Sequence, residues 1–155
     1  MFAEFNLAIN IDEFSERYLK YLGEGSFLID GALELCNYLL KKNYRIVIIT
    51  NGIKEVQLKR IQRSELKNFI ETIIVSEDAG YQKPNSEIFE YAFKKINFKD
   101  RERSIIIGDS LTSDIQGGIN FGIDTCWFNP SGKKNELSIE PKYEIQELKH
   151  IEGIL

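Results

Sequence analysis

The chain has little of several residues on which common functional sites depend. Histidine occurs once, as His150 in a tail rich in lysine and glutamate, so general base chemistry by histidine is not expected. The two cysteines, Cys36 and Cys126, lie far apart in apolar surroundings. We therefore expect them to be reduced core residues of a cytoplasmic protein rather than partners in a disulfide.

The chain also lacks an excess of basic residues and a long apolar run. It has 20 Lys and Arg against 24 Asp and Glu, a formal net charge of -4, with lysines interleaved with glutamates. This pattern argues against nucleic acid as the main partner, and no apolar run approaches the length of a membrane span. What is present is 155 residues, 43% hydrophobic and 28% charged, which suits one globular domain.

Apolar β-branched runs alternate with amphipathic helical patterns along the chain. This alternation predicts an α/β fold with a doubly wound parallel sheet. Residues 26–30 are flanked by three glycines, Gly23, Gly25 and Gly31, that permit sharp turns. We expect this segment to connect two modules of the chain. The strands are expected at 44–50, 72–75, 104–108 and 124–128, the helices at 12–22, 32–42, 54–63, 85–96 and 112–121, and a small closing element at 143–151.

Two carboxylates follow the most apolar strand. Gly108 ends the strand, Asp109 stands at its tip, and Asp114 comes five residues later at the start of a helix. Ligands bind at the carboxyl ends of strands in open α/β sheets, and paired carboxylates there suit Mg²⁺. The alternative is an Asp in a turn and another at a helix N-terminus, where negative charge is favoured.

Polar groups also follow two earlier strands. Thr50 and Asn51-Gly52 end one strand, and Lys83 lies in a loop that enters a helix. A hydroxyl, backbone amides and an ammonium are the donors that a phosphoryl group needs. Each residue has an ordinary explanation alone, but together with Asp109 and Asp114 they predict a phosphate site with a metal.

These motifs resemble those of the haloacid-dehalogenase (HAD) superfamily of phosphohydrolases. Residues 48–52, 82–84 and 107–114 are similar to its second, third and fourth motifs. The flanking residues 51–60 and 122–129 resemble the noncanonical pyrimidine 5'-nucleotidase branch. The resemblance runs from about residue 2 to residue 148 and implies a Rossmann-like core, a Mg²⁺ cofactor and a nucleoside 5'-monophosphate as substrate.

The resemblance also implies a role for each motif residue. Thr50, Asn51 and Gly52 would bind the phosphoryl group, and Thr50 and Lys83 would take part in catalysis, Lys83 by stabilising charge on the nucleophile and the phosphate. Asp109 would ligate Mg²⁺, and Asp114 would support the metal directly or through water. Ser110 could position these ligands without contacting the metal itself.

The chain departs from the family pattern at its first motif, an apolar strand that ends in Asp-x-Asp. Aspartate occurs at 12, 30, 78, 100, 109, 114 and 124, and no two of these are separated by a single residue. By resemblance the family's first strand lies between those at 44–50 and 104–108, so we expect a sheet without its central strand. Residues 1–25 would be a remnant of a helical cap and residues 26–155 the core.

Three functions follow from these features. The first is the larger part of a Mg²⁺-dependent nucleotidase that is inactive alone and self-associates through exposed strand edges. The second is a noncatalytic domain that binds Mg²⁺ and phosphate or a partner, and the third is a nonfunctional truncation product. A receiver domain also uses acidic residues, a Thr and a Lys. Its acids precede the Thr and Lys in the sequence, whereas Asp109 and Asp114 follow both, so only a permuted chain would fit. A dinucleotide site is disfavoured because residues 117–122 lack the Gly-x-Gly-x-x-Gly spacing.

Overall fold

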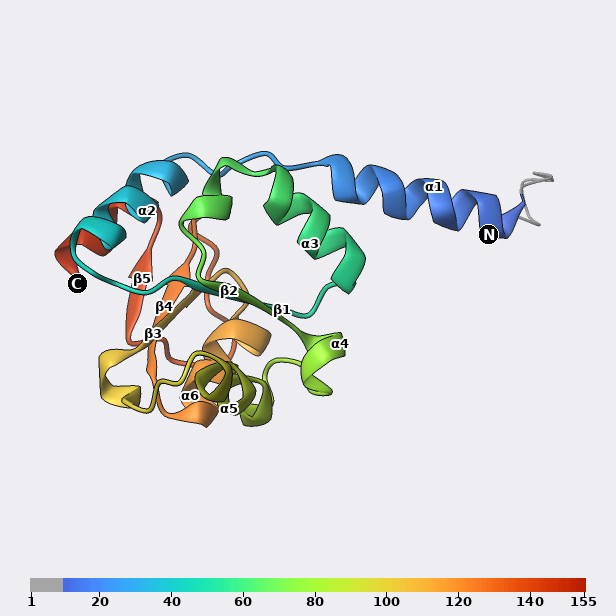
Figure 1. Cartoon of the computed structure of the whole chain (residues 1–155). Coiled ribbons are helices and arrows are strands. Elements are labelled where there is room, and N and C mark those ends of the chain that lie inside the picture. Colours follow the sequence, from blue (N-terminus) through green and yellow to red (C-terminus); the bar gives the residue numbers. More distant parts are fainter. Residues whose placement is uncertain (1–9) are drawn as a thin grey trace.

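The computed structural model describes residues 10–155, and Figure 1 shows helices packed around parallel strands. The α/β prediction is confirmed. The α-helices are α1 (Ile11–Glu24), α2 (Ala32–Lys41), α3 (Lys54–Arg63), α4 (Ser76–Ala79), α5 (Ser86–Lys95) and α6 (Gln116–Phe121). The strands are β1 (Val47–Thr50), β2 (Thr72–Val75), β3 (Ile105–Gly108), β4 (Asp124–Phe128) and β5 (Tyr143–Ile145). Short helical turns occupy Glu65–Asn68, Arg101–Arg103, Leu111–Ile115 and Leu148–Gly153.

The strands form two separate sheets rather than one. β1 pairs with β2, and β3, β4 and β5 form the second sheet in that order; all pairs are parallel. Within residues 10–155, β1 and β3 are not hydrogen-bonded to each other. The division falls between the two strands where the resemblance implies that a central strand is missing.

Apolar side chains fill both faces of the strands. One core cluster packs α2 and the C-terminal turn against β4 and β5 through Leu35, Leu39, Cys126 and Ile151. The other packs α5 and α6 against β2. In that cluster Phe121 stacks on Phe89 at a ring distance of 5.5 Å. Helices therefore cover both sides, as the doubly wound prediction requires.

Two adjacent glycines let α6 lie close to its neighbours. A Cβ on Gly117 would come within 2.7 Å of Phe89 on α5. A Cβ on Gly118 would lie 2.5 Å from Ile106 and 2.6 Å from Thr125. Residues 117 and 118 must therefore be small for α6 to pack against α5 and the sheet, which is a structural reason for this glycine pair.

Helix α1 projects from the body and contacts α3 only near its C-terminal end (Figure 1). The Asn10 side chain caps it by accepting hydrogen bonds from Asp12 N and Glu13 N. The predicted apolar face is present, yet Tyr18 is 54% exposed and Leu22 40%. Gly23 is its one buried residue. The boundary between a cap remnant at 1–25 and a core at 26–155 stays a prediction, and residues 1–9 of that remnant lie outside the described part.

Three local features differ from the sequence-based expectations. β1 is shorter than the predicted strand 44–50, and in the residues before it Arg45 forms an ion pair with Glu71. The predicted helix 112–121 begins as a π-helical turn at Leu111–Ile115 before α6. The short helix α4 was not predicted, and the Lys83–Pro84 peptide bond is cis.

Both cysteines are buried free thiols, as expected for core residues. Burial disfavours the charged thiolate and raises the pKa of Cys126 to about 11. It also raises the pKa of Cys36. Over residues 10–155, the helices are too short or too polar to cross a bilayer.

Candidate active site

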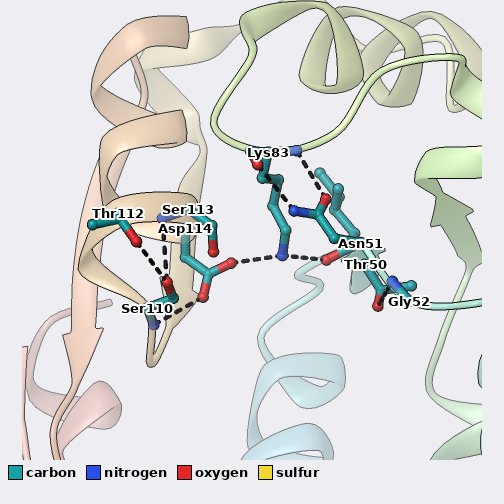
Figure 2. Close-up of polar contacts among 9 residues, drawn as sticks. Thr50, Asn51, Gly52, Lys83, Ser110, Thr112, Ser113 and Asp114 are labelled. Atoms are coloured by element: carbon teal, nitrogen blue, oxygen red, sulfur yellow. Dashed lines mark hydrogen bonds and ion pairs between the residues drawn. The ribbon is translucent and has the colours of Figure 1, made fainter.

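A lysine connects the carboxyl ends of β1 and β3. Lys83 Nζ donates to Asp114 Oδ1 at 2.6 Å and to the carbonyl oxygen of Ile49 at 2.6 Å (Figure 2). The Lys83 and Asp114 side chains are only 11% and 9% exposed. Solvent therefore screens this ion pair little, and one ammonium group joins the two sheets.

The residues around β3 explain why Asp114 points toward Lys83. A Cβ on Gly108 would lie 2.4 Å from the Asp114 side chain, so only glycine leaves room for the carboxylate over the strand end. Ser110 N donates to Asp114 Oδ2 at 3.1 Å. The Ser110 hydroxyl accepts a hydrogen bond from Ser113 N at 3.2 Å, which caps the turn that carries Asp114. Ser110 thus positions Asp114.

The loop after β1 is joined to the loop that carries Lys83. Asn51 Nδ2 donates to the Lys83 carbonyl oxygen at 2.9 Å, and Asn51 Oδ1 accepts from Lys83 N at 2.8 Å. Gly52 N donates to Thr50 Oγ1 at 3.2 Å. Because Thr50 Oγ1 is an acceptor here, its hydroxyl hydrogen remains able to donate to a ligand. Figure 2 shows Thr50, Asn51 and Gly52 on the side of Lys83 opposite to Asp114.

Asp109 is exposed at the tip of β3 and lines a cavity of about 570 Å³. Trp127 Nε1 donates to the Asp109 carbonyl oxygen at 3.0 Å and so fixes its backbone. Buried Asn129 holds the loop that lines the cavity: its Oδ1 accepts from Lys133 N at 2.9 Å, and its Nδ2 donates to Glu144 Oε1 at 2.7 Å. Sequence reasoning assigned no role to Trp127 or Asn129; the available signal was their place near the carboxyl end of β4, with Trp127 inside the strand and Asn129 directly after it.

The structure therefore brings together most of the predicted site residues. Lys83, Asp114, Asn51 and Ser110 share one hydrogen-bonded network, with Thr50 and Gly52 at the end of β1 beside it. Asp109 is adjacent to Ser110 in the chain, at the same end of β3. The functional roles that the resemblance implies for these residues stay predictions.

The acids of the site fit a hard cation. Mg²⁺ is bound in proteins by one or two carboxylates and retains several waters, which Asp109 and Asp114 could satisfy. Asp114 uses one oxygen for Lys83 and the other for Ser110 N, and each oxygen keeps a further lone pair. In the described part of the chain no group of three or more His, Cys, Asp or Glu side chains is placed to hold a metal.

Comparison with known proteins decides the family. A model of the haloacid dehalogenase-like hydrolases matches residues 2–128. The chain belongs to this family. It is 46% identical over 140 residues to the HAD-hydrolase YfnB of Bacillus subtilis, covering 90% of this chain and 59% of YfnB. The crystal structure of YfnB bound to magnesium superposes with a TM-score of 0.89 and 42% identity, over 99% of this chain and 67% of that one.

Two further relatives of this HAD-family chain are named as pyrimidine 5'-nucleotidases. YjjG of Escherichia coli is 34% identical over 149 residues, which are 96% of this chain and 66% of YjjG. PynA of Streptococcus pneumoniae is 37% identical over 131 residues, 84% of this chain and 55% of PynA. The chain thus spans between 55% and 66% of the length of these three curated relatives.

Proposed function

We propose that this chain supplies the phosphate- and Mg²⁺-binding part of a HAD-type phosphomonoesterase whose substrates are pyrimidine nucleoside 5'-monophosphates. The observation that carries the proposal is the position of Lys83, whose ammonium contacts Asp114 and the β1 carbonyl next to Thr50. The similarity to two pyrimidine 5'-nucleotidases supports the substrate class. We also keep a cytoplasmic location as a prediction, supported by the two free thiols.

Each residue would act on the phosphate through a charge or a donor. The Thr50 hydroxyl and the backbone amides of Asn51 and Gly52 would donate to phosphate oxygens, since the Asn51 side chain is committed to the Lys83 backbone. Lys83 would offset the negative charge that grows as the phosphoryl group is transferred. Asp109 would ligate Mg²⁺, with Asp114 supporting it directly or through water, and Mg²⁺ would neutralise the remaining phosphate charge.

The reaction also requires a nucleophile, and none of these residues is assigned that role. We therefore expect the chain alone to bind phosphate without turning over a nucleotide. A Mg²⁺- and phosphate-binding domain without catalysis is the second candidate, favoured by the Lys83–Asp114 ion pair and the Ser110 N to Asp114 hydrogen bond, which organise the site without a nucleophile. The two candidates differ in whether activity appears when the rest of an enzyme is supplied.

Calorimetric titration with inorganic phosphate, with and without Mg²⁺, tests the proposed site. We expect phosphate binding that depends on Mg²⁺ and is lost in Asp109→Asn and Lys83→Met. The matched control Asp100→Asn removes an exposed carboxylate outside the network and should bind as the unmodified chain does. Absence of phosphate binding by the unmodified chain at millimolar concentration would refute the proposed site.

A second assay tests for catalysis by incubating the chain with Mg²⁺ and uridine or cytidine 5'-monophosphate. No phosphate release above the buffer rate is expected. Robust release that disappears in Asp109→Asn would contradict the incomplete site and reveal a nucleophile elsewhere in the chain.

A further inference from the structure

The glycine at position 52, in the loop after β1, is not required by its backbone conformation. Glycine is favoured where φ is positive, but among residues 10–155 Gly52 is not one of the residues with positive φ. The group that excludes a side chain there is Gln57 on α3. A Cβ on Gly52 would lie 2.2 Å from Gln57 Nε2 and 2.8 Å from Gln57 Cδ. Glycine at 52 therefore makes room for the Gln57 amide.

The geometry of α3 explains why Gln57 reaches this loop. Gln57 N donates to the carbonyl oxygen of Ile53, the N-cap residue, at 3.0 Å, so Gln57 lies one turn into the helix. Side chains on a helix are tilted toward its N-terminus. The neighbouring residue Val56 is 5% exposed and holds this turn against the body of the protein. The Gln57 side chain therefore extends back over the loop that precedes α3.

Gln57 and Thr50 lie at the same loop residue. Because a Cα–Cβ bond is about 1.5 Å long, Gln57 Nε2 lies within about 3.7 Å of Gly52 Cα. Gly52 N donates to Thr50 Oγ1 at 3.2 Å (Figure 2). Two side-chain donors, the Thr50 hydroxyl and the Gln57 amide, therefore flank Gly52 at the carboxyl end of β1, where both can reach a bound phosphate.

The Gln57 amide is not used inside the described part of the protein. Over residues 10–155 it makes no hydrogen bond, yet no buried side-chain nitrogen or oxygen there lacks a partner, so the amide is open to solvent. The lysines in the first two turns of α3 are engaged instead, Lys54 with Asp78 and Lys59 with Glu55. Gln57 thus offers an uncommitted donor on the side of α3 that faces the loop.

We propose that Gln57 is a further phosphate-binding residue, whose Nε2 donates to a nonbridging oxygen of the substrate phosphate beside Thr50. This inference rests on the proposed function and adds a neutral donor from α3 to the donors of the β1 loop and Lys83. A dianionic phosphate presents only acceptors, so the amide nitrogen can bind it and the amide oxygen cannot. Replacing the amide by a carboxylate of the same shape should therefore be worse than removing it.

Calorimetric titration with inorganic phosphate in the presence of Mg²⁺ tests the role of Gln57. We expect Gln57→Ala to weaken phosphate binding about tenfold, which is the effect of losing one hydrogen bond to a charged group. Gln57→Glu should weaken it further, because its carboxylate is negative and only accepts hydrogen bonds. The matched control Gln62→Ala makes the same change at an exposed position of α3 and should bind as the unmodified chain does.

Gly52→Ala gives an independent test. Its Cβ would occupy the place of the far end of a flexible side chain, so Gln57 should turn away while the loop keeps its conformation. We expect Gly52→Ala to weaken phosphate binding about as much as Gln57→Ala does, and the double variant to bind no more weakly than either single variant. Losses that multiply in the double variant would mean that the two residues act separately, and would overturn the inference.

The remaining outcomes separate this inference from the proposed function. Phosphate binding that is lost in Asp109→Asn but equal in Gln57→Ala and Gln62→Ala would leave the site standing and refute the role of Gln57. Equal weakening of inorganic phosphate and uridine 5'-monophosphate in Gln57→Ala would support it. Weakening of the nucleotide alone would assign Gln57 to the nucleoside and overturn it. Absence of phosphate binding by the unmodified chain would refute both.

Discussion

At the scale of single residues, the Lys83–Asp114 ion pair is the contact on which the candidate site depends. Both side chains are about nine-tenths buried, and the carboxylate has one further hydrogen bond, from Ser110 N. Removing one member of a buried pair leaves an uncompensated charge, which is more costly than removing both. Comparing a single with a double variant therefore shows how much of the loss in stability comes from leaving the Asp114 charge unpaired.

Lys83→Met keeps much of the side-chain length but removes the charge. We expect the free energy of unfolding to fall by about 3 kcal/mol, since Asp114 is left buried without its cation. Urea denaturation measures the change. The double variant Lys83→Met/Asp114→Asn should recover part of the loss, because asparagine can still accept from Ser110 N. A single variant as stable as the unmodified chain would show that the pair contributes nothing.

Cys126 gives a prediction for pH dependence. Its pKa in the folded chain is about 11, raised by burial from an ordinary value of 9.0. Above pH 9 the unfolded chain loses this proton while the folded chain keeps it, so the free energy of unfolding should fall between pH 9 and 11. Cys126→Ala should show a shallower decline over that interval, measured by urea denaturation at each pH. Identical slopes would contradict the assignment.

At the scale of elements, the sequence predicted the helices and strands well because each follows from a local pattern. The β-branched run at Ile105–Ile107 and the helical spacing of Ile88, Phe89 and Ala92 reproduce β3 and the buried face of α5. Gly122 ends α6 in the left-handed conformation, as expected. The convergence of Thr50, Lys83 and Asp114 was predictable because parallel strands present their carboxyl ends at one edge.

Other features could not be read from local patterns because they depend on contacts between distant residues. The need for glycine at 108 comes from the Asp114 side chain. β1 begins only at Val47, three residues later than predicted, and Arg45 before it pairs with Glu71. Similarly, periodicity predicts an apolar face on α1 but says nothing about whether another element covers it.

Gly118→Ala tests the close packing of α6. Alanine favours a helix over glycine by up to about 1 kcal/mol, but its Cβ would lie 2.5 Å from Ile106 and 2.6 Å from Thr125. We expect overpacking to dominate and the free energy of unfolding to fall by about 1 to 3 kcal/mol. The control Gly153→Ala places its Cβ in open space and should change stability little. A stabilised Gly118→Ala would mean that α6 can move away from the sheet.

At the scale of the whole molecule, the divided sheet limits stability. An unsatisfied buried backbone group costs about 1 to 3 kcal/mol, while domains are stable by only about 5 to 15 kcal/mol. Within residues 10–155, β1 and β3 are half-buried and each is hydrogen-bonded to a neighbouring strand on one side only, so the backbone groups on their other edges reduce that margin. We expect the free energy of unfolding of the chain alone to lie near the lower end of this range.

The division of the sheet also has a consequence for the order of folding. β1 and β2 lie within residues 47–75, and β3, β4 and β5 within residues 105–145, so each half is built from one continuous stretch of chain. Short sequence separations within a half favour rapid formation, whereas joining the halves closes a longer loop. Each half can therefore form early, and the last step is their alignment across the junction that Lys83 spans.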